Sequence, residues 1–407
     1  MGILRAGASR IRRHGGSAIV RIRPRRGHRG RAMSRATQPR LDRHRRTRPA
    51  GSAAAMRPDV PASQRLPGQG ALLAFLCRPE NYPESTPAVE VLETHMSWVF
   101  LTRRHAYKLK KPFRRGRIDY TTVAARRRSC LRELRLNRRL APDVYLDVVA
   151  LTIDGSGRLA LGGAGERIDW LLRMRRLPAE QSLERRLLAR QAGADAARRI
   201  VARLVSFYAG AAHARWTPAG YRRHLLSAVA SAARDLVRPA YGLARAEADT
   251  VADALREFAA RHGDLLDARV RGARIVEGHG DLRPEHIYLS DPPTIIDCIE
   301  FDRGLRLRDP VDELAFLAME CDRLGCPDFD AWLFDAHADL AGDRPPRPLV
   351  EFHKGHSAFV RAAIAIAHLD DPDTGPRAHW TARARAYLQQ ARGYLAQARG
   401  MHERTGA

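Results

Sequence analysis

The stretch GHGDLRPEHIYLSDPPTIIDCIEF, residues 278–301, decides how this chain is interpreted. Asp281 follows a short strand-like run on a tight turn, and Asp297 ends a second apolar run. Two histidines, His279 and His286, lie in the same stretch. Such groups occur together in metal cages, in hydrolases and in the catalytic loops of phosphotransferases. Each interpretation requires different partners elsewhere in the sequence.

The positive charge of the chain is concentrated at its N-terminus. The formal net charge is +26 over 407 residues, but residues 1–55 hold 16 Arg against one Asp, which leaves +11 on the other 352 residues. Residues 1–66 are rich in Arg, Gly, Ser and Pro without sustained periodicity, so we expect a disordered extension. It is either a basic arm or targeting peptide, or the product of a start codon placed too far upstream. Nucleic-acid binding is therefore expected only through this extension.

The five cysteines are scattered along the chain and form no CxxC pair. We expect free thiols, as in a reducing compartment, and hence a cytoplasmic protein. No apolar run approaches the ~20 residues that a membrane span requires, so no membrane partner is expected.

The order of the predicted elements indicates an α+β protein with two lobes. Residues 67–177 alternate strand-like runs with one helix over 121–140, which predicts a small β-rich N-lobe. Residues 178–400 show mostly amphipathic helical patterns and predict a larger helical C-lobe that contains the 278–301 stretch. Within that lobe, Asp309 is expected to cap a helix that begins at Pro310.

A phosphoryl-transfer site needs a carboxylate to orient the attacking hydroxyl, metal ligands, and a cation on the phosphates. Asp281 fits the first role, and Asp297 fits the second with His286 as a helper. Lys108, in the strand-like segment HAYK, fits the third, and Glu133 on the following helix is placed to pair with it.

Spacing alone leaves two alternatives open. Strand alternation puts Lys110 on the same face as Lys108, so either lysine can be the partner of Glu133. A metallohydrolase built on His279, Asp281, His286 and Asp297 is the second alternative, although it leaves the lysine–glutamate pair unexplained. His279 is otherwise expected to be a structural turn residue, and Glu300 either supports the metal or is a surface carboxylate.

The order of these motifs resembles the protein-kinase-like fold and, within it, the bacterial aminoglycoside phosphotransferase-like family. The resemblance covers about residues 68–395. Its motifs are AYKLKKP, RRRSCLRELRLNRRLAPDVYL, RMRRLP, GHGDLRPEHIYL and IDCIEFDRGLRLRDPVDELAFLAMEC. Some members continue into a P-loop ATPase domain. This sequence has no GxxxxGK[ST] motif, so the stand-alone form is expected.

The resemblance implies a bilobal, ATP-dependent phosphotransferase that uses Mg²⁺ and acts on a hydroxyl of a small molecule. By the resemblance, the N-lobe binds nucleotide, with the backbone around Met174–Leu177, including Arg175, as the adenine hinge. The resemblance makes Asp281 the catalytic base, Asp297 the metal ligand and the Lys108–Glu133 pair the phosphate holder. His286, the candidate second metal ligand, is not implied by the resemblance.

Two departures from the family pattern support a rival interpretation. His286 stands where kinases carry Asn, and the segment ETHMS, residues 93–97, replaces a Gly-rich phosphate loop. The rival is a nucleotide-binding regulatory pseudokinase without turnover. The family label does not identify the acceptor, because Arg303, Arg306 and Arg308 near the site argue against a polycationic substrate.

Overall fold

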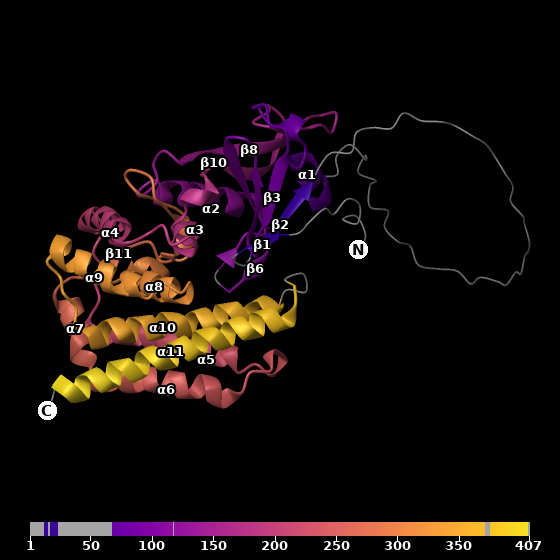
Figure 1. Cartoon of the computed structure of the whole chain (residues 1–407). Coiled ribbons are helices and arrows are strands. Elements are labelled where there is room, and N and C mark those ends of the chain that lie inside the picture. Colours follow the sequence, from indigo (N-terminus) through magenta and orange to yellow (C-terminus); the bar gives the residue numbers. More distant parts are fainter. Residues whose placement is uncertain (1–11, 15–16, 23–66, 117, 371–374, 406–407) are drawn as a thin grey trace, which may run out of the picture. The chain divides into compact units, whose positions relative to one another are not determined.

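The computed structural model describes residues 12–14, 17–22, 67–116, 118–370 and 375–405. The chain forms two compact units, which divide at residues 109–110, 148–149 and 171–172. The first unit is strand-rich and the second, larger unit is mainly helical (Figure 1). The predicted α+β class, with a β-rich N-terminal part and a helical C-terminal part, is confirmed. The lobe boundary predicted at residues 177–178 stays a prediction.

The first unit is built on an antiparallel sheet of eight strands in the order β1-β2-β3-β4-β5-β10-β8-β9. The turn at residues 102–105 joins β4 to β5 as predicted, with the Thr102 N–H donating to the carbonyl of His105 at 2.9 Å. The strands are β1 (Arg12–His14), β2 (Ser17–Ile22), β3 (Val89–Glu93), β4 (Ser97–Leu101), β5 (His105–Lys110), β8 (Tyr145–Ile153), β9 (Leu159–Leu161) and β10 (Glu166–Arg175).

The N-terminal extension contributes two strands where we expected none. β1 pairs with β2, and β2 pairs antiparallel with β3, so that Val20 lies opposite Val91. The rest of the predicted disordered extension, including the nucleic-acid prediction for it, lies outside the described residues.

The core of the first unit lies on one side of the sheet. The helix α1 (Gln69–Leu76) contributes Leu72 and Leu76, which pack with Phe100, Tyr107 and other strand residues. The segment between β3 and β4 is a tight turn, in which Thr94 accepts from the Ser97 N–H at 3.0 Å. A short turn therefore takes the place of a Gly-rich loop.

The second unit has two hydrophobic cores formed by helices. One core joins α5, α6, α10 and α11; the other joins α3, α4, α8 and α9 and includes Leu282, Ile287 and Ile295 of the opening stretch. The helices are α2 (Val123–Asn137), α3 (Leu183–Leu188), α4 (Ala194–Ala209), α5 (Pro218–Leu236), α6 (Arg245–Arg261), α7 (Gly263–Arg271), α8 (Pro310–Arg323), α9 (Asp328–Ala341), α10 (Arg347–Ile366) and α11 (Arg377–Thr405).

Short strand pairs frame the opening stretch within the helical unit. β11 (Val276–Glu277) pairs with β14 (Leu307–Arg308), and β12 (Ile287–Tyr288) pairs with β13 (Thr294–Ile295). The unit also holds the pair β6 (Arg114–Arg115) and β7 (Ile118–Asp119). Because the apolar side chains of β12 and β13 are buried against α4 and α8, the polar groups between these strands are held at defined positions.

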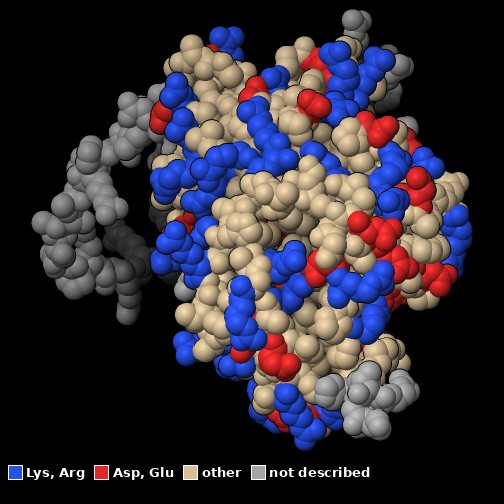
Figure 2. Space-filling model, turned by 90° about the vertical axis from the view of Figure 1, so that its left-hand side faces the viewer, with Lys and Arg blue, Asp and Glu red and all other residues tan. Residues whose placement is uncertain are grey.

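The surface is strongly basic, as the composition indicates. On the face shown in Figure 2, Lys and Arg side chains are spread widely, while Asp and Glu form smaller groups between them. All five cysteines are free thiols. No helix among the described residues combines the length and apolarity needed to cross a membrane.

Candidate active site

The turn that carries Asp281 is anchored by a buried glutamate on α8. The carboxylate of Glu313 accepts the backbone N–H of His279 at 2.8 Å and also that of Gly280. A Cβ atom on Gly278 would come within 2.5 Å of this carboxylate, so the close approach requires glycine there. Gly280 has a φ of +89°, in the left-handed region that glycine tolerates. The two glycines of GHGD are therefore explained by the geometry of the turn.

Glu313 is a positioning residue that the sequence analysis missed. Burial raises the pKa of its carboxyl, while the backbone N–H groups of His279 and Gly280 act in the opposite direction. The hydroxyl of Tyr208 on α4 also donates to Glu313, at 2.8 Å. The sequence signal that could have identified Glu313 is its position as a charged residue inside the apolar run that follows Asp309. The predicted N-cap was correct, since the Asp309 carboxylate accepts the Val311 N–H at 3.0 Å.

His279 is a structural member of the same turn. Its Nε2 lies 2.9 Å from the carbonyl of Ile296, which only accepts, so Nε2 carries the proton. Its Nδ1 then accepts the backbone N–H of Asp281 at 3.3 Å. Burial lowers the pKa of His279 to about 4, so the ring is neutral at pH 7. The ring ties the Asp281 turn to the chain just before Asp297.

The structure brings Asp281, His286 and Asp297 together. Nδ1 of His286 lies 2.9 Å from the backbone carbonyl of Asp281 and 3.7 Å from its carboxylate, while Nε2 lies 3.6 Å from the carboxylate of Asp297. The side chain of Asp297 is 44% exposed and that of Asp281 is 25% exposed. Both carboxylates are therefore accessible to a ligand.

The donor set fits a divalent cation that receives its remaining ligands from a substrate. Because Nδ1 of His286 donates to a carbonyl, Nε2 is the ring nitrogen that faces the Asp297 carboxylate. A cation between this nitrogen and the carboxylate would be bound by both groups. Among the described residues, no group of three or more His, Cys, Asp or Glu side chains forms a metal cage. Mg²⁺ commonly takes only one or two protein carboxylates and completes its shell with phosphates and water.

Asp297 itself has a strained backbone. Its φ of +62° lies in the left-handed region, which costs on the order of 1 kcal/mol for a residue with a side chain. Two hydrogen bonds hold this conformation: the Asp297 N–H donates to the Tyr145 hydroxyl at 3.0 Å, and the Cys298 N–H donates to the Asn137 side chain at 2.8 Å. Asn137 also donates to the carbonyl of Glu133 on α2. Helix α2 therefore positions the Asp297 segment directly.

The lysine that pairs with Glu133 is Lys110, which corrects the predicted pairing with Lys108. Nζ of Lys110 lies 2.6 Å from the Glu133 carboxylate, and the two side chains are 2% and 0% exposed. Lys108 is half-buried and belongs to the first unit. Strand alternation places both lysines on one face of β5. Lys110, the last residue of that strand, is the one that contacts Glu133 on α2.

Lys110 has a second acidic partner, Glu300. The Glu300 carboxylate lies 2.6 Å from Nζ and also accepts the hydroxyl of Tyr120 at 2.9 Å. Glu300 is 7% exposed, so it is not a surface carboxylate, and its support of a metal at Asp297 stays a prediction. Burial raises the pKa of Tyr120 to about 12, which keeps its hydroxyl a donor.

The predicted hinge residues lie at the end of β10. The Arg175 N–H already donates to the Val144 carbonyl at 2.8 Å, and Met174 packs beside Tyr145 and Leu172. Adenine pairing at Met174 and Arg175 stays a prediction, and the Arg175 N–H is not its donor in this conformation.

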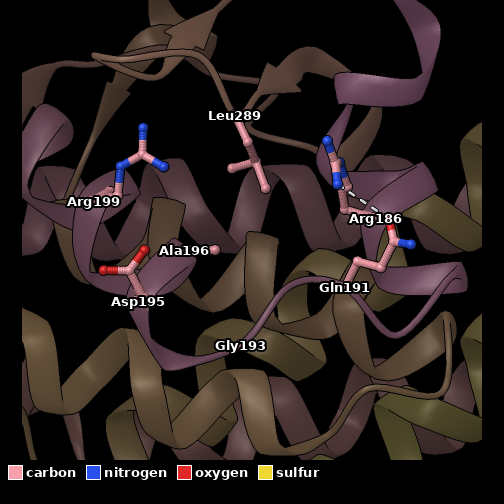
Figure 3. Close-up of a pocket in the computed structure, with 7 residues that line it drawn as sticks. All are labelled: Arg186, Gln191, Gly193, Asp195, Ala196, Arg199 and Leu289. Atoms are coloured by element: carbon pink, nitrogen blue, oxygen red, sulfur yellow. Dashed lines mark hydrogen bonds between the residues drawn. The ribbon is translucent and has the colours of Figure 1, made fainter.

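A separate hollow of about 270 Å³ lies at the N-terminal end of α4 (Figure 3). Arg186 and Arg199 lie on opposite sides of Leu289 in this view. No predicted site residue lines the hollow, so it carries no part of the functional proposal.

Comparison with known proteins gives relatives without described functions and small-molecule kinases of similar fold. No family model matches the chain. Uncharacterised proteins of Mycobacterium tuberculosis and Mycobacterium bovis are 31% identical over 292 residues, which are 68% of this chain and 55% of each relative. The chain thus spans about half the length of these relatives.

The solved structures that the chain resembles include choline or ethanolamine kinases and aminoglycoside phosphotransferases. A choline/ethanolamine kinase family protein from Mesorhizobium loti gives a TM-score of 0.47 at 14% identity, covering 81% of this chain and 98% of that protein. An aminoglycoside phosphotransferase from Streptomyces rimosus gives 0.41 at 17% identity, covering 72% and 98%. Because the scores lie below 0.5, the functional proposal rests on the site geometry.

Proposed function

We propose that the protein is an ATP-dependent phosphotransferase that acts on a hydroxyl of a small molecule. The observation that supports this most directly is the convergence of Asp281, His286 and Asp297 around one anchored turn. The buried Lys110–Glu133 pair lies in the same compact unit and supplies the cation that such a site requires. A hydrolase interpretation leaves this pair without a role.

In the proposed reaction, Asp281 accepts the proton of the acceptor hydroxyl. The hydroxyl oxygen forms a bond to the γ-phosphorus of ATP, and the bond between that phosphorus and the oxygen of the leaving ADP breaks. The Asp281 carboxylate is accessible, and the backbone of Asp281 is held by hydrogen bonds to His279 and His286. Asp297, with Nε2 of His286, would hold magnesium, which neutralises charge on the phosphates when bound. Lys110 takes the phosphate-binding role that the sequence analysis gave to Lys108.

The acceptor is proposed to be a small hydroxylated molecule that is not a polycation. The loop after Glu300 carries Arg303 and Arg306, both bound to Glu277, and Arg308, which is bound to Asp312. Glu277 and Asp312 are thus already neutralised by arginines. A polycationic drug would find little unpaired negative charge here.

A rival function, nucleotide binding without turnover, is favoured by two observations. His286 replaces the oxygen-donating Asn of kinases, and Mg²⁺ prefers oxygen ligands. The Lys110 ammonium is also enclosed by two carboxylates. Both observations concern catalytic competence, so turnover discriminates between the two functions.

The test measures ADP formation with ATP and Mg²⁺ against a panel of hydroxylated metabolites. Asp281→Asn should reduce turnover by about 10²–10⁴-fold with nucleotide binding retained, since only the general base is removed. Asp297→Asn should abolish the strengthening of nucleotide binding by Mg²⁺. The matched control is Asp195→Asn, an exposed carboxylate that lines the separate hollow, and it should leave both properties unchanged. Nucleotide binding with no turnover on any acceptor would support the rival function, and undiminished turnover in Asp281→Asn would reject the catalytic assignment.

A further inference from the structure

The ammonium of Lys110 is contacted by two carboxylates. Glu133 and Glu300 each place a carboxylate oxygen 2.6 Å from Nζ. The Lys110 side chain is 2% exposed, and those of Glu133 and Glu300 are 0% and 8% exposed. A second buried carboxylate is costly unless its interactions offset its loss of hydration.

The two acids differ in how the chain holds them. Glu133 lies within helix α2, about one turn before its C-terminal end. Glu300 lies in irregular chain between β13 and the short helix η6 (Gly304–Arg306), three residues after Asp297. Its carboxylate is fixed by side-chain hydroxyls, at 2.9 Å from Tyr120 and 3.3 Å from Ser129. Glu133 is therefore a permanent partner of the lysine, whereas Glu300 can leave by side-chain rotation.

The position of Glu300 conflicts with phosphate binding at Lys110. A phosphate oxygen needs hydrogen-bond distance to Nζ, which is enclosed by the two carboxylates and lies 5.1 Å from the ring centre of Tyr120. Asp297 and Cys298 are anchored separately from Glu300, because their N–H groups donate to Tyr145 and Asn137.

We propose that Glu300 is an acidic latch that competes with nucleotide phosphates for Lys110. This inference rests on the proposed function, because it assumes that Lys110 binds the phosphates. In the latched state the lysine is neutralised internally and polyphosphate binds weakly. Binding displaces the Glu300 carboxylate from Nζ and leaves Glu133 to position the lysine. Glu300 thus sets nucleotide affinity and takes no part in the chemical step.

The test is calorimetric binding of ADP and of pyrophosphate, both without divalent metal, to the full chain. Glu300→Gln keeps an oxygen acceptor for Tyr120 and removes the competing charge, so affinity should rise about tenfold. Glu133→Gln, the matched change on the other side of the same ammonium, should lower affinity instead. Tyr120→Phe removes one hydroxyl that holds the latch and should raise affinity by a smaller factor. Glu277→Gln, a paired carboxylate of the same unit, is the control and should leave affinity unchanged.

A second readout does not depend on the variants folding equally well. The chain has only four lysines, so isotope-labelled lysine gives a simple NMR spectrum in which Lys110→Arg assigns one signal. Pyrophosphate should shift that signal in the wild-type protein as one carboxylate is exchanged for phosphate. If the wild type binds nucleotide and Glu300→Gln binds no tighter, the latch is rejected while the proposed function stands. If no variant binds nucleotide or pyrophosphate, both are rejected.

Discussion

The second unit contains two buried lysines that are surrounded by carboxylates in different ways. Lys354 on α10 lies 2.9 Å from both Asp330 on α9 and Asp322 on α8, and 4.4 Å from the ring centre of Tyr394 on α11. Every partner of this set belongs to a helix. Lys110, in contrast, has one helical partner, Glu133, and one in irregular chain, Glu300.

The comparison separates a structural charge cluster from one that we propose to be functional. Burial by itself would lower the pKa of Lys354, but the carboxylates of Asp330, Glu351 and Asp322 raise it above its ordinary value. Since packed helices fix all of these groups, the cluster has no means of exchanging a partner. A lysine with a carboxylate partner in irregular chain can exchange that partner for a ligand.

The largest expected effect is the loss of stability in Lys354→Met. Removing the only lysine of the cluster leaves buried carboxylates with insufficient positive charge, and breaking such a set costs about 3–5 kcal/mol. Urea unfolding should show this loss, while nucleotide affinity per folded molecule stays the same. The double variant Lys354→Met with Asp330→Asn should recover part of the stability. Full stability in the single variant would contradict the structural assignment.

A smaller loss of stability is expected for Lys110→Met. Glu300 can turn toward water once the lysine is absent, so we expect about 1–3 kcal/mol, with only Glu133 left uncompensated. Binding of ADP and pyrophosphate should be lost at the same time. The same urea unfolding experiment measures the first effect and calorimetry the second. If Lys110→Met destabilised the protein more than Lys354→Met, the contrast between the two clusters would be wrong.

The smallest effect concerns Glu351, whose Oε2 makes no hydrogen bond. Burial raises the pKa of Glu351 above its ordinary 4.5, and Lys354 and Arg347 offset only part of this. The folded state therefore holds the proton more tightly than the unfolded state, so this group lowers stability as pH rises from about 4.5 through its folded pKa. Glu351→Gln should flatten that decline and change stability at pH 7 by no more than about 1 kcal/mol. Unfolding midpoints measured between pH 4 and pH 8 would show an unchanged slope if the charge of Glu351 did not matter.

The candidate site was predicted from sequence in its parts but not in its connections. Asp281, His286 and Asp297 could be selected because their residue types and spacing suit one chemistry. The choice between Lys108 and Lys110 could not be made, since a strand presents both on one face. Glu313 and Glu300 were missed as partners. Glu313 binds a turn more than thirty residues away, and Glu300 binds a lysine 190 residues away, so no local sequence pattern indicates either contact.

The sequence by itself predicted most of the helices and strands, although not β1 and β2, and suggested one type of chemistry. Hydrophobic periodicity, the N-cap at Asp309 and the glycines of GHGD are local signals, so they can be read without knowledge of the fold. Only the tertiary structure decided which charges meet. It gave Glu133 to Lys110, added Glu300 as a second acid, and anchored Asp297 through Tyr145 and Asn137. Pairing of buried charges depends on distances between elements that are far apart in the chain, and those distances are set by packing.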